Sequence, residues 1–144
     1  MDAFRPPTPR PQGILHDLGL VPTPSELIAA VKAGLDVRVF VDLARRLGVS
    51  EARLAEVAGI APTTLTRRKR AGTLTPDEGE HVLRLAALLD RAVQVFEGEA
   101  DAADWLRTPN IALGGDTPLA LADTELGARE VDDLLGRLEH GVYS

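Results

Sequence analysis

The chain has 144 residues, which suits one domain or two small ones, and 44% of them are hydrophobic, enough to form a core. Aromatic residues make up only 3%, so Leu, Val and Ala must build that core, which favours helices. Cysteine is absent, which excludes disulfides and thiolate chemistry, and no apolar run is long enough to span a bilayer.

The net charge of −6 is distributed unevenly along the chain. Residues 1–70 carry a net charge of +4, whereas residues 71–144 carry −10. The acidic total argues against indiscriminate coating of nucleic acid but leaves room for one local basic face. The start of the chain lacks the basic and apolar pattern of a signal peptide, so we predict a cytoplasmic protein without a membrane partner.

Residues 1–22 are rich in proline, and we predict that this segment is disordered or extended. Four of its aliphatic residues are expected to pack onto the body: Ile14, Leu15, Leu18 and Leu20. A capping sequence at Thr23–Glu26 predicts a helix that runs to Ala33 and ends at Gly34. Its expected apolar face consists of Leu27, Ile28 and Val31. A second helix is predicted between Asp36 and Gly48.

Residues 51–70 have the pattern of a helix-turn-helix. The small Ala55 allows two helices to approach closely, and Gly59 permits the sharp turn between them. Ile60 fills the corner, Pro62 suits the first turn of the second helix, and Leu65 anchors that helix. We therefore predict a helical domain over residues 23–97 that contains this motif.

The second helix of the motif carries its polar groups in one block. In a DNA-reading helix-turn-helix the second helix enters the major groove, so hydroxyls and cations there are candidates for base and phosphate contacts. The predicted DNA-binding residues are Thr63, Thr64, Thr66, Arg67, Arg68, Lys69 and Arg70. The simpler alternative is a solvated basic turn that complements the helix dipole.

A second capping sequence at Thr75–Glu78 predicts the longest helix, which ends near Phe96. Its apolar positions form an unusually broad stripe: Val82, Leu85, Ala86, Leu88, Leu89, Ala92, Val93, Val95 and Phe96. Such a stripe indicates either a central core helix or a helix that also forms part of a homodimer seam.

Residues 98–144 are predicted to contain a short helix with Trp105, a tight turn at Gly114-Gly115, and a final helix that starts at Asp123 or Thr124 and ends at Gly141. The turn is not a phosphate-binding loop, because neither a preceding strand nor a following Gly-Lys-Ser/Thr is present. The three histidines have no metal-ligand spacing, so we predict no metal, no cofactor and no enzymatic activity.

Several of these pieces together resemble the Xre/MbcA/ParS-type antitoxins, which are partners of RES-domain toxins in type II toxin–antitoxin pairs. The resemblance extends from about Leu47 to the end of the chain. Its most specific pieces are Trp105-Leu106, Pro109-Asn110, Leu113-Gly114, Thr117-Pro118, Gly127 with Val131, and Leu138 with Gly141.

The resemblance implies an all-α fold, with an Xre-like helix-turn-helix domain followed by a small helical toxin-binding domain over residues 98–144. It also implies a RES toxin that consumes NAD, a homodimer, and repression of the protein's own operon by binding operator DNA. Such antitoxins block the toxin's cleft with the end of the last helix and the tail. On this chain the corresponding toxin-binding residues are Arg137, His140, Val142, Tyr143 and Ser144. The alternative function is a stand-alone transcription regulator whose C-terminal half serves dimerisation only.

Overall fold

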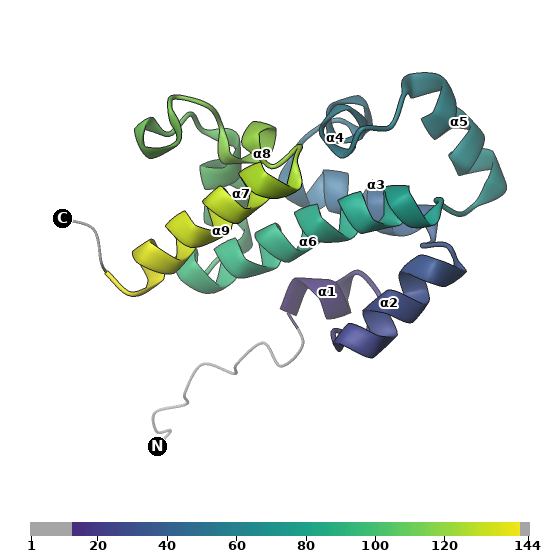
Figure 1. The fold of residues 1–144 in the computed structure, drawn as a ribbon, viewed down its shortest axis with the longest axis horizontal. Coiled ribbons are helices and arrows are strands. Elements are labelled where there is room, and N and C mark those ends of the chain that lie inside the picture. Colours follow the sequence, from purple (N-terminus) through teal and green to yellow (C-terminus); the bar gives the residue numbers. More distant parts are fainter. Residues whose placement is uncertain (1–12, 142–144) are drawn as a thin grey trace, which may run out of the picture.

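A computed structural model describes residues 13–141, and these residues are helical with no named strand (Figure 1). The α-helices are α1 (Gly13–Asp17), α2 (Pro24–Ala33), α3 (Val37–Leu47), α4 (Glu51–Ala58), α5 (Pro62–Ala71), α6 (Pro76–Phe96), α7 (Glu99–Arg107), α8 (Pro118–Leu121) and α9 (Glu125–Glu139). A short 3-10 helix, η1 (Ile111–Leu113), lies in the loop before α8. The predicted all-α class is confirmed.

Local capping signals set the bounds of most helices. Side chains of Thr23, Asp36, Ser50, Thr75 and Thr124 each accept a hydrogen bond from a backbone N–H in the first turn that follows. At α6 the cap is reciprocal, because Thr75 N–H also donates to the Glu78 carboxylate over 2.9 Å. The predicted starts and ends of α2, α3 and α6 are therefore confirmed.

The long helix α6 is the centre of the molecule. It packs against α1, α2, α3, α4, α7 and α9. One continuous core cluster joins buried residues of these helices except α2, including Phe40, Leu54, Leu85, Leu106 and Leu135, and α2 packs against it through the partly buried Leu27 and Ala30. The broad apolar stripe of α6 thus lies mostly in the protomer's own core, which supports the core-helix interpretation of that stripe.

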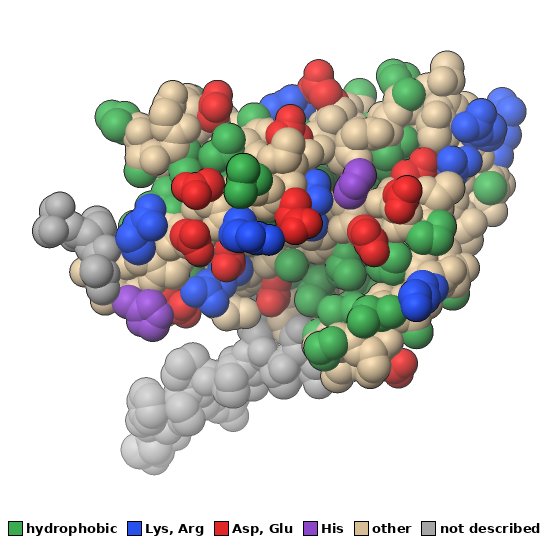
Figure 2. Space-filling view, in the orientation of Figure 1, with side chains coloured by type: hydrophobic (Ala, Val, Ile, Leu, Met, Phe, Trp, Pro, Cys, Tyr) green, Lys and Arg blue, Asp and Glu red, His purple; other side chains and the backbone are tan. Residues whose placement is uncertain are grey.

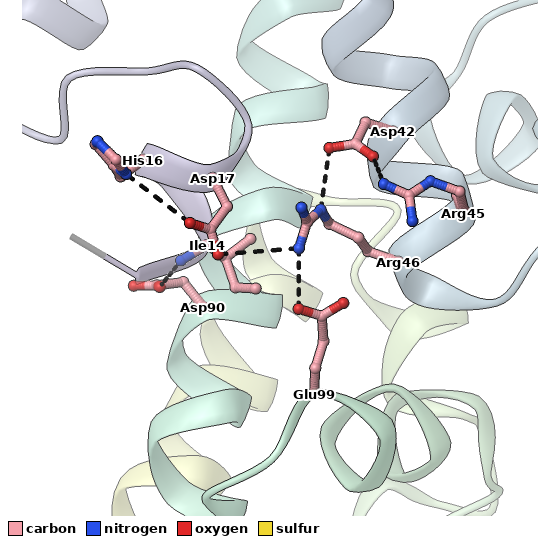
Figure 3. A network of polar contacts seen from close by, with 8 residues as sticks. All are labelled: Ile14, His16, Asp17, Asp42, Arg45, Arg46, Asp90 and Glu99. Atoms are coloured by element: carbon pink, nitrogen blue, oxygen red, sulfur yellow. Dashed lines mark hydrogen bonds and ion pairs between the residues drawn. The ribbon is translucent and has the colours of Figure 1, made fainter. Parts of the chain in front are cut away.

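The segment before α2 differs from the prediction in part. Residues 1–12 lie outside the described residues, but residues 13–17 form a helix rather than an extended chain. Ile14 is fully buried, and its N–H donates to Asp90 Oδ1 of α6 over 2.8 Å (Figure 3). The expected packing of Ile14, Leu15, Leu18 and Leu20 onto the body is confirmed.

Arg46 of α3 connects α3 to α1 and α7 through ion pairs (Figure 3). Its guanidinium lies 3.0 Å from Asp42, 3.0 Å from Glu99 at the start of α7, and 3.9 Å from Asp17 of α1. The Arg46 side chain is only 17% exposed, so these charges are screened less than surface pairs are. The cluster fastens the N-terminal end of α7 to the helix that precedes the helix-turn-helix.

The α2 helix corrects one expectation. Val31 is 5% exposed and Leu27 is partly buried, as predicted, but Ile28 is 55% exposed and does not belong to the core.

Within the described chain no helix is long and apolar enough to cross a membrane.

Candidate functional site

The predicted helix-turn-helix is formed by α4 and α5. Gly59 ends α4 in the left-handed conformation, with φ of 74°, as a turn of this kind requires. Ile60 N–H then donates to Ala55 O over 2.8 Å, and the Ile60 side chain is 4% exposed in the corner between the helices. Leu65 is 8% exposed and anchors α5. These positions agree with the roles that the sequence assigned to them.

The outer face of α5 carries the predicted DNA-binding side chains at one end of the molecule, where Lys and Arg gather (Figure 2). Thr63, Arg67 and Arg70 are exposed, and Thr64 is half-buried. Thr66 is exposed too, but its hydroxyl donates back to Pro62 O over 3.2 Å. Arg67 and Arg70 have no hydrogen bond or ion pair within residues 13–141, so both guanidinium groups are free to meet an anion.

The other two cations of α5 are engaged inside the molecule. Arg68 forms a bidentate pair with Glu78, with Nε to Oε1 at 2.7 Å and Nη2 to Oε2 at 3.1 Å. Lys69 Nζ lies 2.7 Å from Glu51 of α4. These pairs orient α5 against α6 and α4, and they neutralise part of the charge that the sequence assigned to phosphate binding.

Glu78 therefore has two tasks, since it also completes the cap of α6. Its partial burial alone would raise its pKa, but hydrogen bonds from Arg68 and Thr75 outweigh that effect and hold the pKa of Glu78 below its ordinary value. The charged form is thus favoured in the folded protein, and it links the end of α5 to the start of α6.

The other predicted site lies at the end of the molecule away from α5 (Figure 1). Arg137 and His140 are exposed in the last turn and at the cap of α9. Arg91 of α6 lies 3.0 Å from Glu139 and fastens this end of α9. Val142, Tyr143 and Ser144 lie outside the described residues.

Sequence reasoning missed two exposed apolar side chains in the C-terminal half, Ile111 at 96% and Leu126 at 71% exposure. Ile111 lies in η1, and the backbone of Asn110 closes the loop around it. The Asn110 N–H donates to Asp116 O over 3.0 Å, and Asn110 O accepts from Gly115 N–H over 2.9 Å. The η1 turn buries Leu113 and presents Ile111 to solvent. The sequence Ile-Ala-Leu is too short to show a periodic pattern. It could therefore not predict that Leu113 is buried and Ile111 is exposed.

The described residues hold no group of three or more His, Asp or Glu placed to bind a metal ion. The structure instead presents exposed cations on α5, and exposed apolar side chains in η1 and at the start of α9 in the acidic half of the chain.

Comparison with known proteins agrees with this division. The antitoxin Xre-like helix-turn-helix domain matches residues 26–87, and the antitoxin Xre/MbcA/ParS C-terminal toxin-binding domain matches residues 91–141. The two matches meet within α6, which both parts share as a core helix.

Several curated proteins are similar over most of their length. "Antitoxin Xre" of Yersinia enterocolitica is 36% identical over 100% of both chains. "Antitoxin Xre" of Photorhabdus laumondii is 35% identical over 82% of this chain and 81% of its own. The "Prs ADP-ribosylating antitoxin" of a Sphingobium species is 26% identical over 85% of this chain and 83% of its own. The chain thus belongs to the Xre family of antitoxins, with an Xre-like helix-turn-helix domain followed by a C-terminal toxin-binding domain.

Proposed function

We propose that this antitoxin binds a RES-domain toxin that consumes NAD, blocks its active-site cleft, and represses its own operon through α5 in the cytoplasm. The observation that carries the proposal is the match of residues 91–141 to a toxin-binding domain, combined with accessible Arg137, His140 and Ile111 in that half of the chain. A stand-alone regulator would leave that match without a purpose.

The chemistry of the tail suits a nucleotide cleft. A pocket for NAD must accommodate phosphates, riboses and flat rings. Arg137 supplies a guanidinium that can pair with anionic groups, and Tyr143 supplies a ring that can stack in place of nicotinamide or adenine. We propose that these residues, with His140, Val142 and Ser144, occupy the cleft, while Ile111 and Leu126 contact the toxin outside it.

For repression, we propose that a two-fold dimer places its two α5 helices on a palindromic operator. Thr63, Thr64 and Arg67 face base edges, Thr66 lies beside them, and Arg70 contacts a phosphate. Arg68 and Lys69 position α5, and their partly neutralised charges add less to phosphate binding than their sequence suggests.

The test is co-expression with a RES-domain toxin encoded beside this gene. The full chain should co-purify with that protein and restore growth, and a chain ending at Gly141 should restore growth less well while its thermal unfolding is unchanged. Ile111→Glu should weaken co-purification about 10-fold or more, because it removes an apolar contact and adds a charge that must be desolvated. Full rescue by both variants would remove the tail and the η1 loop from the mechanism.

A further inference from the structure

A shallow apolar hollow lies between α2 and α6, away from both surfaces described above. Its volume is about 350 Å³, and its lining consists of Pro24, Leu27, Ile28, Val31, Lys32, Glu80 and Leu83. Figure 2 shows apolar side chains gathered over α2 and the adjoining part of α6. We refer to these seven residues as the α2–α6 hollow.

The hollow combines a recess with a projecting side chain. Ile28 is 55% exposed at its edge, although Val31, one turn further along α2, is 5% exposed in the core. An aliphatic side chain exposed beside an apolar recess is a feature of surfaces that another protein covers. Because Ile28 and the recess belong to one patch, two copies related by a two-fold axis can each insert Ile28 into the recess of the other.

The two charges of the hollow fit the same arrangement. Lys32 on α2 and Glu80 on α6 have opposite signs, and both are exposed. Neither takes part in an ion pair within the described part of the chain. In a two-fold contact, Lys32 of each copy can approach Glu80 of the other, so one patch carries both charges that such a contact needs.

We propose that the α2–α6 hollow is the surface through which two copies of this chain form a symmetric dimer. The toxin is a poorer occupant, because none of the hollow's seven residues lies in the toxin-binding match at 91–141, and all but Pro24 lie within the helix-turn-helix match at 26–87. The inference rests on the proposed repressor function only for the reason why a dimer is needed. The dimer contact itself is tested without DNA.

The first test measures the molar mass of the full chain against concentration by sedimentation equilibrium. Wild type should reach the mass of a dimer, and Ile28→Glu should raise the dissociation constant about 100-fold, because a carboxylate would replace the apolar insert. Ile111→Glu is the matched control: it makes the same change at a more exposed isoleucine and should leave the mass unchanged. A monomeric wild type, or a dimer that survives Ile28→Glu, would overturn the inference.

The second test exchanges the charges. Lys32→Glu and Glu80→Lys should each weaken the dimer about 10-fold, because each places like charges opposite one another twice per dimer. The double variant should return to within about threefold of wild type, whereas Glu130→Lys on α9 should change nothing. Additive losses in the double variant would contradict the paired arrangement.

Toxin binding by the same variants separates this inference from the proposed function. Ile28→Glu should bind toxin as wild type does, while losing dimerisation and operator affinity. A variant that dimerises normally but no longer binds toxin would assign the hollow to the toxin and overturn the inference, leaving the proposed antitoxin activity intact.

Discussion

Arg67 and Arg68 are neighbours in the chain but have different surroundings. Arg67 is exposed without a partner in the described structure, whereas Arg68 is held by both oxygens of Glu78. An exposed guanidinium with no partner gives up no contact when it meets a phosphate, but Arg68 would have to leave Glu78 first. The run Arg67–Arg70 reads as one basic block in the sequence because its carboxylate partners lie on other helices.

Arg67→Ala should therefore lower operator affinity and reduce the slope of log affinity against log salt by about one unit. Thermal unfolding should be unchanged. Arg129→Ala, which removes an exposed arginine of α9, is the control and should leave the slope as in wild type. Failure of wild type to bind the operator at low salt, with and without toxin, would remove the repressor role altogether.

Glu78 should make stability depend on pH. Its pKa is lower in the folded than in the unfolded protein, so its contribution is present above the unfolded pKa and is lost as pH falls toward the folded pKa. At neutral pH, Glu78→Gln should lower the free energy of unfolding by about 1 kcal/mol, because Gln retains the cap but not the charged pair with Arg68.

The difference in unfolding free energy between wild type and Glu78→Gln should shrink as pH is lowered through the carboxyl range. Urea unfolding at several pH values measures it. Glu130→Gln, at an exposed glutamate with no partner among residues 13–141, should show no such difference. A difference that stays constant from neutral to acid pH would show that the charge of Glu78 does not stabilise the fold.

Helices whose ends carry their own signals could be predicted closely. The starts of α2, α3 and α6 follow from Thr-Pro and Asp caps, and the ends of α2 and α3 follow from terminal glycines, all of which act within one turn. By contrast, α1 depends on Asp90, which is 76 residues away from Ile14 and completes the first turn of α1. The proline-rich composition led to the prediction of a disordered or extended segment, and no local pattern predicts this helix.

The start of α9 is packed so closely that its glycine has a specific role. A Cβ on Gly127 would lie 1.8 Å from Leu121 O and 2.8 Å from the carbon of that carbonyl. Gly127→Ala should therefore lower the free energy of unfolding by about 3 kcal/mol or more and weaken toxin binding, because backbone must move to relieve the contact.

Gly136→Ala in the same helix is the matched control. Its Cβ would meet only the Arg91 guanidinium at 3.4 Å, and Ala favours a helix by up to about 1 kcal/mol over Gly. Calorimetry of both variants should show a lower melting temperature for the first and an unchanged or higher one for the second. Equal effects would contradict the close approach of α9 to Leu121.

For the molecule as a whole, the sequence could assign the two functional halves but not their fine structure. The motif glycine and the small residue of α4–α5 indicate the first half by residue type at fixed spacing, whereas the resemblance of Trp105 to Gly141 to the antitoxin family indicates the second. The outward position of Ile28 and the engagement of Arg68 and Lys69 depend on which helix lies alongside, so they required the structure.

The two halves share a helix and a core, and are not separate domains connected by a flexible linker. α6 runs through both family matches, and Arg46 connects α3 to the start of α7 through Glu99. One continuous core therefore holds α5 at one end and the last turn of α9 at the other (Figure 1). This arrangement supports the proposal that DNA and toxin bind separate surfaces of the molecule.

The most direct test of the account is the rate of NAD consumption by the purified cognate toxin as this antitoxin is titrated in. The account predicts that the rate falls linearly to near zero at a fixed stoichiometric ratio, and that a chain ending at Gly141 leaves residual activity while still binding. A tight complex between the full chain and a toxin that continues to consume NAD at its free rate would contradict it.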